Sequence, residues 1–249
     1  MTEAVQQKGV GRVAVLVPAA GRGSRLGGPR KQFRRLGGRP LLEQTLRAFA
    51  LHPEVDGLIV AVPADRVEQV AASLPAAGIP KGWQVVAGGR TRQESVQAAL
   101  AALPPDVALV LVHDAVRPFI LPGQISAVIE ATRRVGAAAL AIPEADTVRR
   151  VRDGLLGETV PRAGLYRMQT PQGFRRPVLE AAVALGASGM EGTDEAMLAE
   201  RAGHAVEIVE GHERNVKITT SDDLERARAQ FAPAVRVGTG YDLHRLVDG

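Results

Sequence analysis

The residues best suited to chemistry lie between positions 18 and 33, directly after a short apolar run. This stretch reads Pro-Ala-Ala-Gly-Arg-Gly-Ser-Arg-Leu-Gly-Gly-Pro-Arg-Lys-Gln-Phe. Its small residues let backbone N–H groups approach phosphate oxygens, and its glycines permit tight turns that point several of these groups inward. Arg25 and Lys31 add cations that can bind the same phosphates. The stretch therefore predicts a phosphate cradle.

Two well-known glycine motifs do not fit this stretch. The dinucleotide fingerprint G-x-G-x-x-G fails because Leu26 occupies the position of its third glycine. In addition, no acidic residue closes the second predicted strand, and the G-K-[ST] of a Walker A loop is absent. A plain glycine-rich surface loop remains the alternative interpretation.

A second cluster, His-Asp-Ala-Val-Arg-Pro, occupies residues 113–118 at the end of another apolar run. Asp114 can bind Mg²⁺ or a substrate hydroxyl, and Arg117 can neutralise a phosphate. The alternative is a structural Asp–Arg pair at the end of the sheet. His113 is disfavoured as a general base, because a phosphate monoester with a second pKa of about 6 is already largely dianionic at neutral pH.

The types of side chain in these clusters favour one kind of mechanism. They offer several Arg and Lys, one carboxylate that could hold a metal, and no evident nucleophile. An enzyme that joins two phosphate compounds must bring two polyanions together and stabilise charge at phosphorus. Positioning and cations supply nearly all of that catalysis.

The elements that position these clusters alternate between strand and helix. Strands are predicted at residues 12–17, 57–62, 83–87, 107–112, 137–142 and 205–209. Helices are predicted at residues 40–51, 64–74, 91–103, 122–134, 175–185, 193–202 and 221–231. Such repeated units predict an α/β fold, a mostly parallel sheet with helices on both faces. Ligands bind at the carboxyl ends of such strands, where both clusters lie. Residues 144–162 break the alternation and predict an extended β-hairpin arm.

Composition excludes several classes of function. The 249 residues contain no cysteine, which rules out disulfides, thiolate zinc sites and a cysteine nucleophile, and which suits a reducing cytoplasm. No apolar run approaches the roughly 20 residues of a membrane span. Aromatic residues make up only 3%, which leaves few surfaces for stacking nucleic-acid bases. The net charge of +4 is mild, but the six Arg and Lys residues from Arg22 to Arg35, with no acidic residue among them, suit a small anionic ligand. Neither a nucleic acid nor a membrane is expected as a partner.

The ordered set of motifs resembles one family. Besides the first two clusters, the set comprises Asp146-Thr147, Val160-Pro161-Arg162, Thr170-Pro171-Gln172-Gly173-Phe174, Thr193-Asp194-Glu195-Ala196 and Asn215-Val216-Lys217. Over residues 12–231 the chain resembles the 2-C-methyl-D-erythritol 4-phosphate cytidylyltransferases of the non-mevalonate isoprenoid pathway. The resemblance implies a Rossmann-like nucleotidyltransferase fold. It also implies transfer of CMP from CTP to 2-C-methyl-D-erythritol 4-phosphate, with release of pyrophosphate.

The resemblance also implies roles for individual residues. Catalytic roles fall to Arg25, Lys31 and Lys217. CTP would be bound by Ala19, Ala20, Gly21, Gly23, Gly89, Ser95 and Ala115. The acceptor, a small polyol phosphate, would be bound by Asp114, Arg117, Thr147, Arg162 and Thr193. Asp114 would also lie near Mg²⁺ (or Mn²⁺). In the family the arm, about residues 144–163, reaches across a homodimer, so Thr147 and Arg162 would serve the neighbouring site. The alternative interpretation of Thr193 is a helix N-cap, because Thr193-Asp194-Glu195 opens a predicted helix, and the two roles are compatible.

A different resemblance begins after residue 233. Residues 235–244, Val-Arg-Val-Gly-Thr-Gly-Tyr-Asp-Leu-His, resemble the opening strand of 2-C-methyl-D-erythritol 2,4-cyclodiphosphate synthase. On a strand, Asp242 and His244 would share a face and could ligate one metal ion. We therefore expect a cytidylyltransferase domain over 1–233, then a linker and the start of a truncated, inactive second domain over 234–249. Zn²⁺ is expected only where such a second domain is complete.

Two other activities stay open on the sequence alone. A sugar-1-phosphate nucleotidylyltransferase would share the first cluster but needs neither the cluster at 113–118 nor the one at 170–174. A ribitol-5-phosphate cytidylyltransferase would share nearly every motif. Only the tail that resembles the cyclodiphosphate synthase argues against it.

Overall fold

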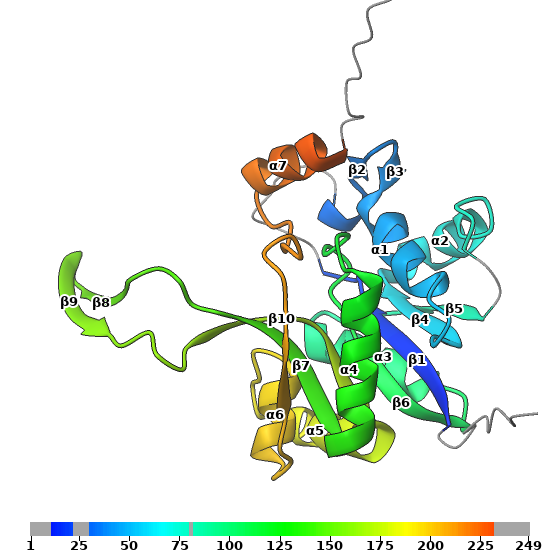
Figure 1. Ribbon diagram of the computed structural model, residues 1–249. Coiled ribbons are helices and arrows are strands. Elements are labelled where there is room, and N and C mark those ends of the chain that lie inside the picture. The colour runs from blue at the N-terminus through cyan, green and yellow to red at the C-terminus, as the bar shows by residue number, and fades with distance from the viewer. Residues whose placement is uncertain (1–10, 22–29, 80–81, 232–249) are drawn as a thin grey trace, which may run out of the picture.

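A seven-stranded sheet forms the centre of the computed structural model, which describes residues 11–21, 30–79 and 82–231 (Figure 1). Across the sheet the strands run in the order β11-β7-β10-β6-β1-β4-β5. In chain order they are β1 (Arg12–Pro18), β4 (Gly57–Val62), β5 (Trp83–Ala87), β6 (Val107–Val112), β7 (Ala137–Pro143), β10 (Tyr166–Arg175) and β11 (Glu207–Glu210). Every pairing is parallel except those of β10, which runs antiparallel to β6 and β7. The predicted α/β fold with a mostly parallel sheet is confirmed.

Helices cover both faces of the sheet, which explains the continuous apolar runs of its central strands. On one face, Val13, Val15 and Val17 of β1 belong to a core with α1 (Leu41–Ala50), α2 (Val67–Ser73) and α4 (Pro122–Val135). On the other face, Ala14 and Leu16 belong to a core with α3 (Arg92–Ala101), α5 (Arg176–Ala187) and α6 (Glu195–Arg201). The side chains of one strand thus alternate between two cores.

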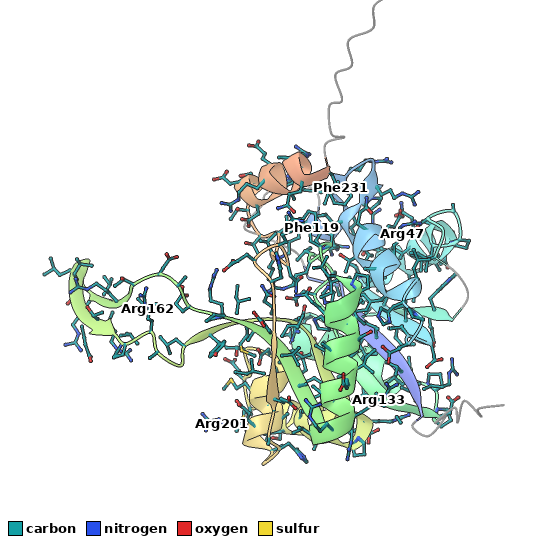
Figure 2. The ribbon with its side chains drawn as sticks, viewed as in Figure 1. Arg47, Phe119, Arg133, Arg162, Arg201 and Phe231 are labelled. Carbon is teal, nitrogen blue, oxygen red and sulfur yellow. The ribbon has the colours of Figure 1, made fainter. Side chains whose placement is uncertain are left out.

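A small third core ties the last helix to the carboxyl ends of the strands. Leu224 and Ala227 of α7 (Ser221–Phe231) pack with Leu36, Val116 and Ile218. Phe231 lies 5.5 Å from Phe119 between ring centroids, and both are labelled in Figure 2. Four short elements complete this region: η2 (Lys31–Phe33), β2 (Arg35–Leu36), β3 (Arg39–Pro40) and η3 (Ala64–Arg66). This core holds Val116 of the second cluster and Ile218, the residue that follows Lys217.

The predicted arm is an antiparallel hairpin of β8 (Val148–Arg152) and β9 (Leu155–Val160), which extends away from the sheet (Figure 1). Its turn is Asp153-Gly154, and both residues have positive φ, as a two-residue hairpin turn requires. Near this turn, Val151, Leu155 and Leu156 are exposed.

Two details differ from the sequence predictions. The ten-residue strand β10 was not predicted, and it contains Pro171, a residue that is rare in central strands. The ladder accommodates it through a register shift between Met168 and Gln172. The expected capping role of Thr193 is wrong: Asp194 is the N-cap of α6, and its carboxylate accepts the N–H of Met197 at 2.9 Å. No helix in the described part of the chain is long and apolar enough to cross a membrane.

Candidate active site

Asp114, directly after β6, is the carboxylate around which the candidate site is built. Its Oδ1 lies 3.4 Å from Nε of Arg92, and its Oδ2 lies 2.9 Å from Nζ of Lys217 and 3.4 Å from Nε of Arg117. Its backbone N–H donates to the hydroxyl of Thr170. The Asp–Arg pair that the sequence left as a structural alternative therefore exists, but it is one part of a larger charge cluster.

The charge cluster keeps Asp114 ionised. Burial of the carboxyl opposes ionisation, but the positive charges of Arg92, Lys217 and Arg117 outweigh it and hold the pKa of Asp114 well below its usual range. Asp114 is therefore a permanent anion at neutral pH. It can accept hydrogen bonds from a substrate hydroxyl or bind a cation.

Two cavities meet at this carboxylate. Arg92, Asp114 and Lys217 line both of them. The first cavity, of about 140 Å³, is otherwise lined by Pro18, Ala19, Ala20, Gly21, Lys31, Gln32, Ser95, Ala115 and Val116. The second, of about 180 Å³, is otherwise lined by Arg117, Met168, Gln169, Thr170, Gln172, Thr193 and Asp194. The arrangement can hold two ligands on either side of one charge cluster.

The first cavity lies at the carboxyl end of β1, where the glycine-rich stretch begins. The amide of buried Gln32 donates to the carbonyl oxygens of Ala19 at 2.5 Å and Gly21 at 3.1 Å. This side chain fixes the described start of the stretch and brings Lys31, its chain neighbour, to the cavity. Of the predicted residues, Ala19, Ala20, Gly21 and Lys31 are thus brought together, whereas Gly23 and Arg25 lie outside the described residues.

Gly88 packs closely against Ala20 and Ser95, two residues that line this cavity. A Cβ on Gly88 would lie 2.6 Å from Cβ of Ala20 and 2.9 Å from Oγ of Ser95, so only glycine fits there. Ser95 lines the cavity and is buried on α3, where its hydroxyl donates to the carbonyl of Thr91. Gly89 packs against Glu94 with no room for a side chain, and it is not among the lining residues.

The last of the predicted CTP-binding residues, Ala115, follows Asp114 and is buried. Its carbonyl oxygen accepts the hydroxyl of Thr45 on α1 at 3.1 Å. Ala115 lines the first cavity, and its hydrogen bond with Thr45 connects the second cluster to α1.

The second cavity gathers the predicted acceptor residues of the main domain. Arg117 is fixed by a hydrogen bond from Nη1 to the carbonyl of Asn215 at 2.6 Å. Thr193 enters the cavity wall beside Asp194, whose carboxylate also accepts the amide of Gln172 at 2.8 Å. Asp114, Arg117 and Thr193, which lie far apart in the sequence, therefore meet at one cavity.

His113 lies behind the cavities and does not line either. Its ring is fully buried, with Nε2 3.1 Å from the carbonyl oxygen of Arg117 and Nδ1 3.1 Å from the hydroxyl of Thr170. Burial lowers the pKa of His113 to about 4, so the ring is neutral at neutral pH. The geometry supports the expectation that His113 is not a general base and gives it a structural role.

The arm residues do not reach the site of their own chain. Thr147 and Arg162 are exposed and line neither cavity. Figure 2 shows Arg162 out on the arm, where its Nη1 donates to the carbonyl of Ala145. Asp242 and His244, the predicted ligands of the tail, lie outside the described residues.

Several site residues carried no individual role in the sequence predictions. Arg92 is the first residue of α3, and it forms an ion pair with Glu195, the first residue of α6. Glu195, Thr170 and Gln172 stood within the quoted motifs, which was the available signal for them. Nothing in the pattern around Arg92 distinguished it from an ordinary helix-surface arginine.

Comparisons with known proteins agree with this geometry. The sequence profile of the family described as IspD, 2-C-methyl-D-erythritol 4-phosphate cytidylyltransferase, matches residues 13–232. A protein of that name from Salinibacter ruber is 52% identical over 218 residues, which cover 87% of this chain and 92% of that protein. A bifunctional enzyme IspD/IspF from Desulforudis audaxviator is 48% identical over 238 residues, which cover 94% of this chain. The chain spans 60% of the length of that bifunctional relative.

Solved structures show the same fold. The 2-C-methyl-D-erythritol 4-phosphate cytidylyltransferase of Thermus thermophilus is 39% identical, with a TM-score of 0.72 over 88% of this chain and 98% of that one. The 4-diphosphocytidyl-2C-methyl-D-erythritol synthase of Anaerococcus prevotii is 31% identical, with a TM-score of 0.77 over the same shares of the two chains. The Rossmann-like nucleotidyltransferase fold is confirmed.

Proposed function

The chain belongs to the 2-C-methyl-D-erythritol 4-phosphate cytidylyltransferase family, and we propose that it transfers CMP from CTP to 2-C-methyl-D-erythritol 4-phosphate. The products would be 4-diphosphocytidyl-2-C-methyl-D-erythritol and pyrophosphate. One observation carries the proposal: two cavities meet at Asp114, among Arg92, Arg117 and Lys217. Such a junction holds two anionic substrates with their reacting groups face to face.

In the proposed reaction, a phosphate oxygen of the acceptor forms a bond to the α-phosphorus of CTP. The bond from that phosphorus to the oxygen bridging it to the β-phosphate breaks, and pyrophosphate leaves with the electron pair. The acceptor oxygen is already deprotonated at neutral pH, so no general base is needed. Lys31 and Arg25 on the nucleotide side and Lys217 at the junction would stabilise the charge that develops.

The first cavity is the proposed CTP site and the second the proposed acceptor site. The base and ribose would lie against Ala19, Ala20, Gly89 and Ser95, with Gly21, Gly23 and Ala115 nearer the phosphates. The acceptor would be held by Asp114, Arg117 and Thr193. Within the described part of the chain, all of these residues line the two cavities except Gly89, which packs against Glu94 and follows Gly88, the neighbour of Ala20 and Ser95.

A divalent metal fits this site only as a partner of the triphosphate. In the described part of the chain, no group of three or more His, Cys, Asp or Glu side chains could hold a metal ion. Mg²⁺ commonly binds one or two carboxylates together with substrate phosphates, and Asp114 is the carboxylate available at the junction. Bound there, Mg²⁺ (or Mn²⁺) would neutralise phosphate charge.

The arm is the proposed contact of a homodimer. Thr147 and Arg162 line neither cavity, and the hairpin that they flank extends away from the sheet of its own chain (Figure 1). Its exposed tip offers Val151, Leu155 and Leu156 for burial against a second copy. In such a dimer, each arm would bring one Thr147 and one Arg162 to the neighbouring site.

The proposed domain boundary lies at residue 233. The family profile ends at residue 232, and this chain matches 60% of the length of the bifunctional relative. Residues 234–249 would begin a unit of the kind that follows in that relative. A cytoplasmic location is supported by the absence of cysteine from the sequence.

The decisive experiment measures pyrophosphate release from CTP with three acceptors: 2-C-methyl-D-erythritol 4-phosphate, ribitol 5-phosphate and a sugar 1-phosphate. We expect rapid release with the first and a product with the mass of the cytidine diphosphate ester. Lys217→Met should abolish release, whereas Arg35→Ala, at an exposed arginine outside both cavities, should not. A higher kcat/KM with ribitol 5-phosphate or the sugar phosphate would contradict the proposal.

A further inference from the structure

Arg92 is held at the junction by a carboxylate that does not line either cavity. Its Nη1 lies 2.6 Å from both oxygens of Glu195, and its Nε lies 3.4 Å from Oδ1 of Asp114. Glu195 is only 1% exposed and comes from the start of α6, whereas Arg92 comes from the start of α3. A chain of three charged groups thus connects the helix layer to the site.

The cations around Asp114 differ in how firmly they are held. Arg92 is fixed by Glu195, and Arg117 by the carbonyl of Asn215. Both guanidinium groups are largely buried, whereas the side chain of Lys217 is 41% exposed. Lysine carries its charge on a flexible stem, and arginine forms a more rigid fork. Lys217 is therefore the cation best able to exchange Asp114 for a substrate phosphate.

That exchange creates a problem which Glu195 can solve. When Lys217 turns toward a phosphate, Asp114 loses one partner while a polyanion arrives beside it. The carboxylate then needs a fixed partner to keep its place, because a displacement of about 1 Å can cost about 10²-fold in rate. Arg92 holds the other carboxylate oxygen, and Glu195 holds Arg92.

We propose that Glu195 is a positioning residue: through Arg92 it anchors the Asp114 carboxylate, so that Lys217 can move from Asp114 to substrate phosphate during cytidylyl transfer. The inference rests on the proposed function for the identity of the substrates. A purely structural role is the alternative, because an acid in the first turn also favours a helix. However, a buried ion pair stabilises a fold little more than apolar residues of the same shape would.

The kinetic test compares Glu195→Gln with Leu198→Ala, a matched loss of core contacts on the same helix. Leu198 is also 1% exposed but contacts neither proposed substrate cavity. We expect Glu195→Gln to lower kcat by about 10-fold or more and to change KM for CTP by less than about threefold. Leu198→Ala should lower the midpoint of urea unfolding and leave kcat near the wild-type value. Glu195→Asp, which keeps the charge, should fall between Glu195→Gln and the wild type.

Two results would overturn the inference. One is a kcat for Glu195→Gln within about twofold of the wild type. The other is a loss of kcat in Leu198→Ala that matches that of Glu195→Gln at equal loss of stability. If Glu195→Gln does not fold, Glu195→Asp decides the matter by the same comparison.

A second measurement separates this inference from the proposed function. The Nε–H signal of Arg92 in a ¹⁵N–¹H spectrum reports the anchor without any substrate. We expect Glu195→Gln to shift this signal and to speed its exchange with water, and Leu198→Ala to do neither. If the wild type releases no pyrophosphate with any acceptor, the proposed function fails. The anchor is then judged by this signal alone, and an unchanged signal in Glu195→Gln would refute it.

Discussion

His113 should make the stability of the protein depend on pH in a defined interval. Burial lowers its pKa to about 4 in the native state, whereas an unfolded chain carries an imidazole with a pKa of about 6.5. Between these values the unfolded state binds a proton that the native state does not, so stability is lost as pH falls from about 6.5 to about 4. At about 1.4 kcal/mol per pKa unit, the full shift corresponds to about 3 kcal/mol.

The assay is equilibrium unfolding in urea at pH 7.5 and pH 5, for the wild type and His113→Gln. Between pH 7.5 and pH 5, the titration of His113 should lower the unfolding free energy of the wild type by about 2 kcal/mol. His113→Gln has no imidazole at this position, so this decrease should be absent from the variant. Glutamine can still donate to the carbonyl of Arg117 and accept from Thr170, the two contacts of the native ring. The variant should therefore fold, with a smaller difference in unfolding free energy between the two pH values.

Comparison of the wild type with His113→Gln separates the effect of His113 from the effects of other titrating groups. Asp114, whose pKa is held well below its usual range, loses its contribution only below about pH 4, outside the interval. Groups that titrate inside the interval are common to both proteins and cancel. If His113→Gln loses as much stability as the wild type, to within about 0.5 kcal/mol, His113 titrates alike in both states and the burial argument fails.

Three further predictions concern the triphosphate, the arm and the tail. Lys31→Ala and Arg25→Ala should each lower kcat by about 10²-fold or more, because each removes a cation that stabilises the phosphate charge developing in the transition state. Arg35→Ala is the control. Turnover close to that of the wild type in either variant would show that residues 18–33 do not form the active loop. Mixing Lys31→Ala with Arg162→Ala should restore part of the activity. In the mixed dimer, one site combines the intact loop of the Arg162→Ala chain with the intact arm of the Lys31→Ala chain. If subunit exchange is shown to occur and no activity returns, the arm does not act on the neighbouring site. Calorimetry with Zn²⁺ should show at most weak binding at the tail, residues 234–249, because Asp242 and His244 are two ligands and a catalytic zinc site needs three. Micromolar binding that is lost in Asp242→Ala would contradict this prediction.

The strands that sequence predicted well are those buried on both faces. β1, β4 and β6 are short Val- and Leu-rich runs because helices cover both sides of them, and this pattern is visible without a structure. β10 contains Pro171, a residue that is rare in central strands, and it changes register along its length. Its place between β6 and β7 is set by tertiary pairing, which no local pattern contains.

The candidate site divides in the same way. The first two clusters follow β1 and β6, which are neighbours in the sheet. Because ligands bind at the carboxyl ends of parallel strands, the sequence was enough to predict that Lys31 and Asp114 belong to one site, and both line the first cavity. The pair of Arg92 and Glu195 spans 103 positions and joins the starts of two packed helices. Neither residue is unusual in its own segment, so their meeting could only be found in three dimensions.

The balance of charge at the junction gives a physical reason to look beyond one chain. In the described part of the site, Lys31, Arg92, Arg117 and Lys217 face Asp114, Asp194 and the Glu195 behind Arg92. Four cations against three carboxylates leave one positive charge in excess. The acceptor phosphate alone brings a charge of about −1.5 to −2, before any triphosphate is bound. We propose that a divalent metal, Arg25 and an arginine from a second arm meet this shortfall. If the mixed dimers of Lys31→Ala and Arg162→Ala regain no activity, the metal and Arg25 have to supply the whole of it.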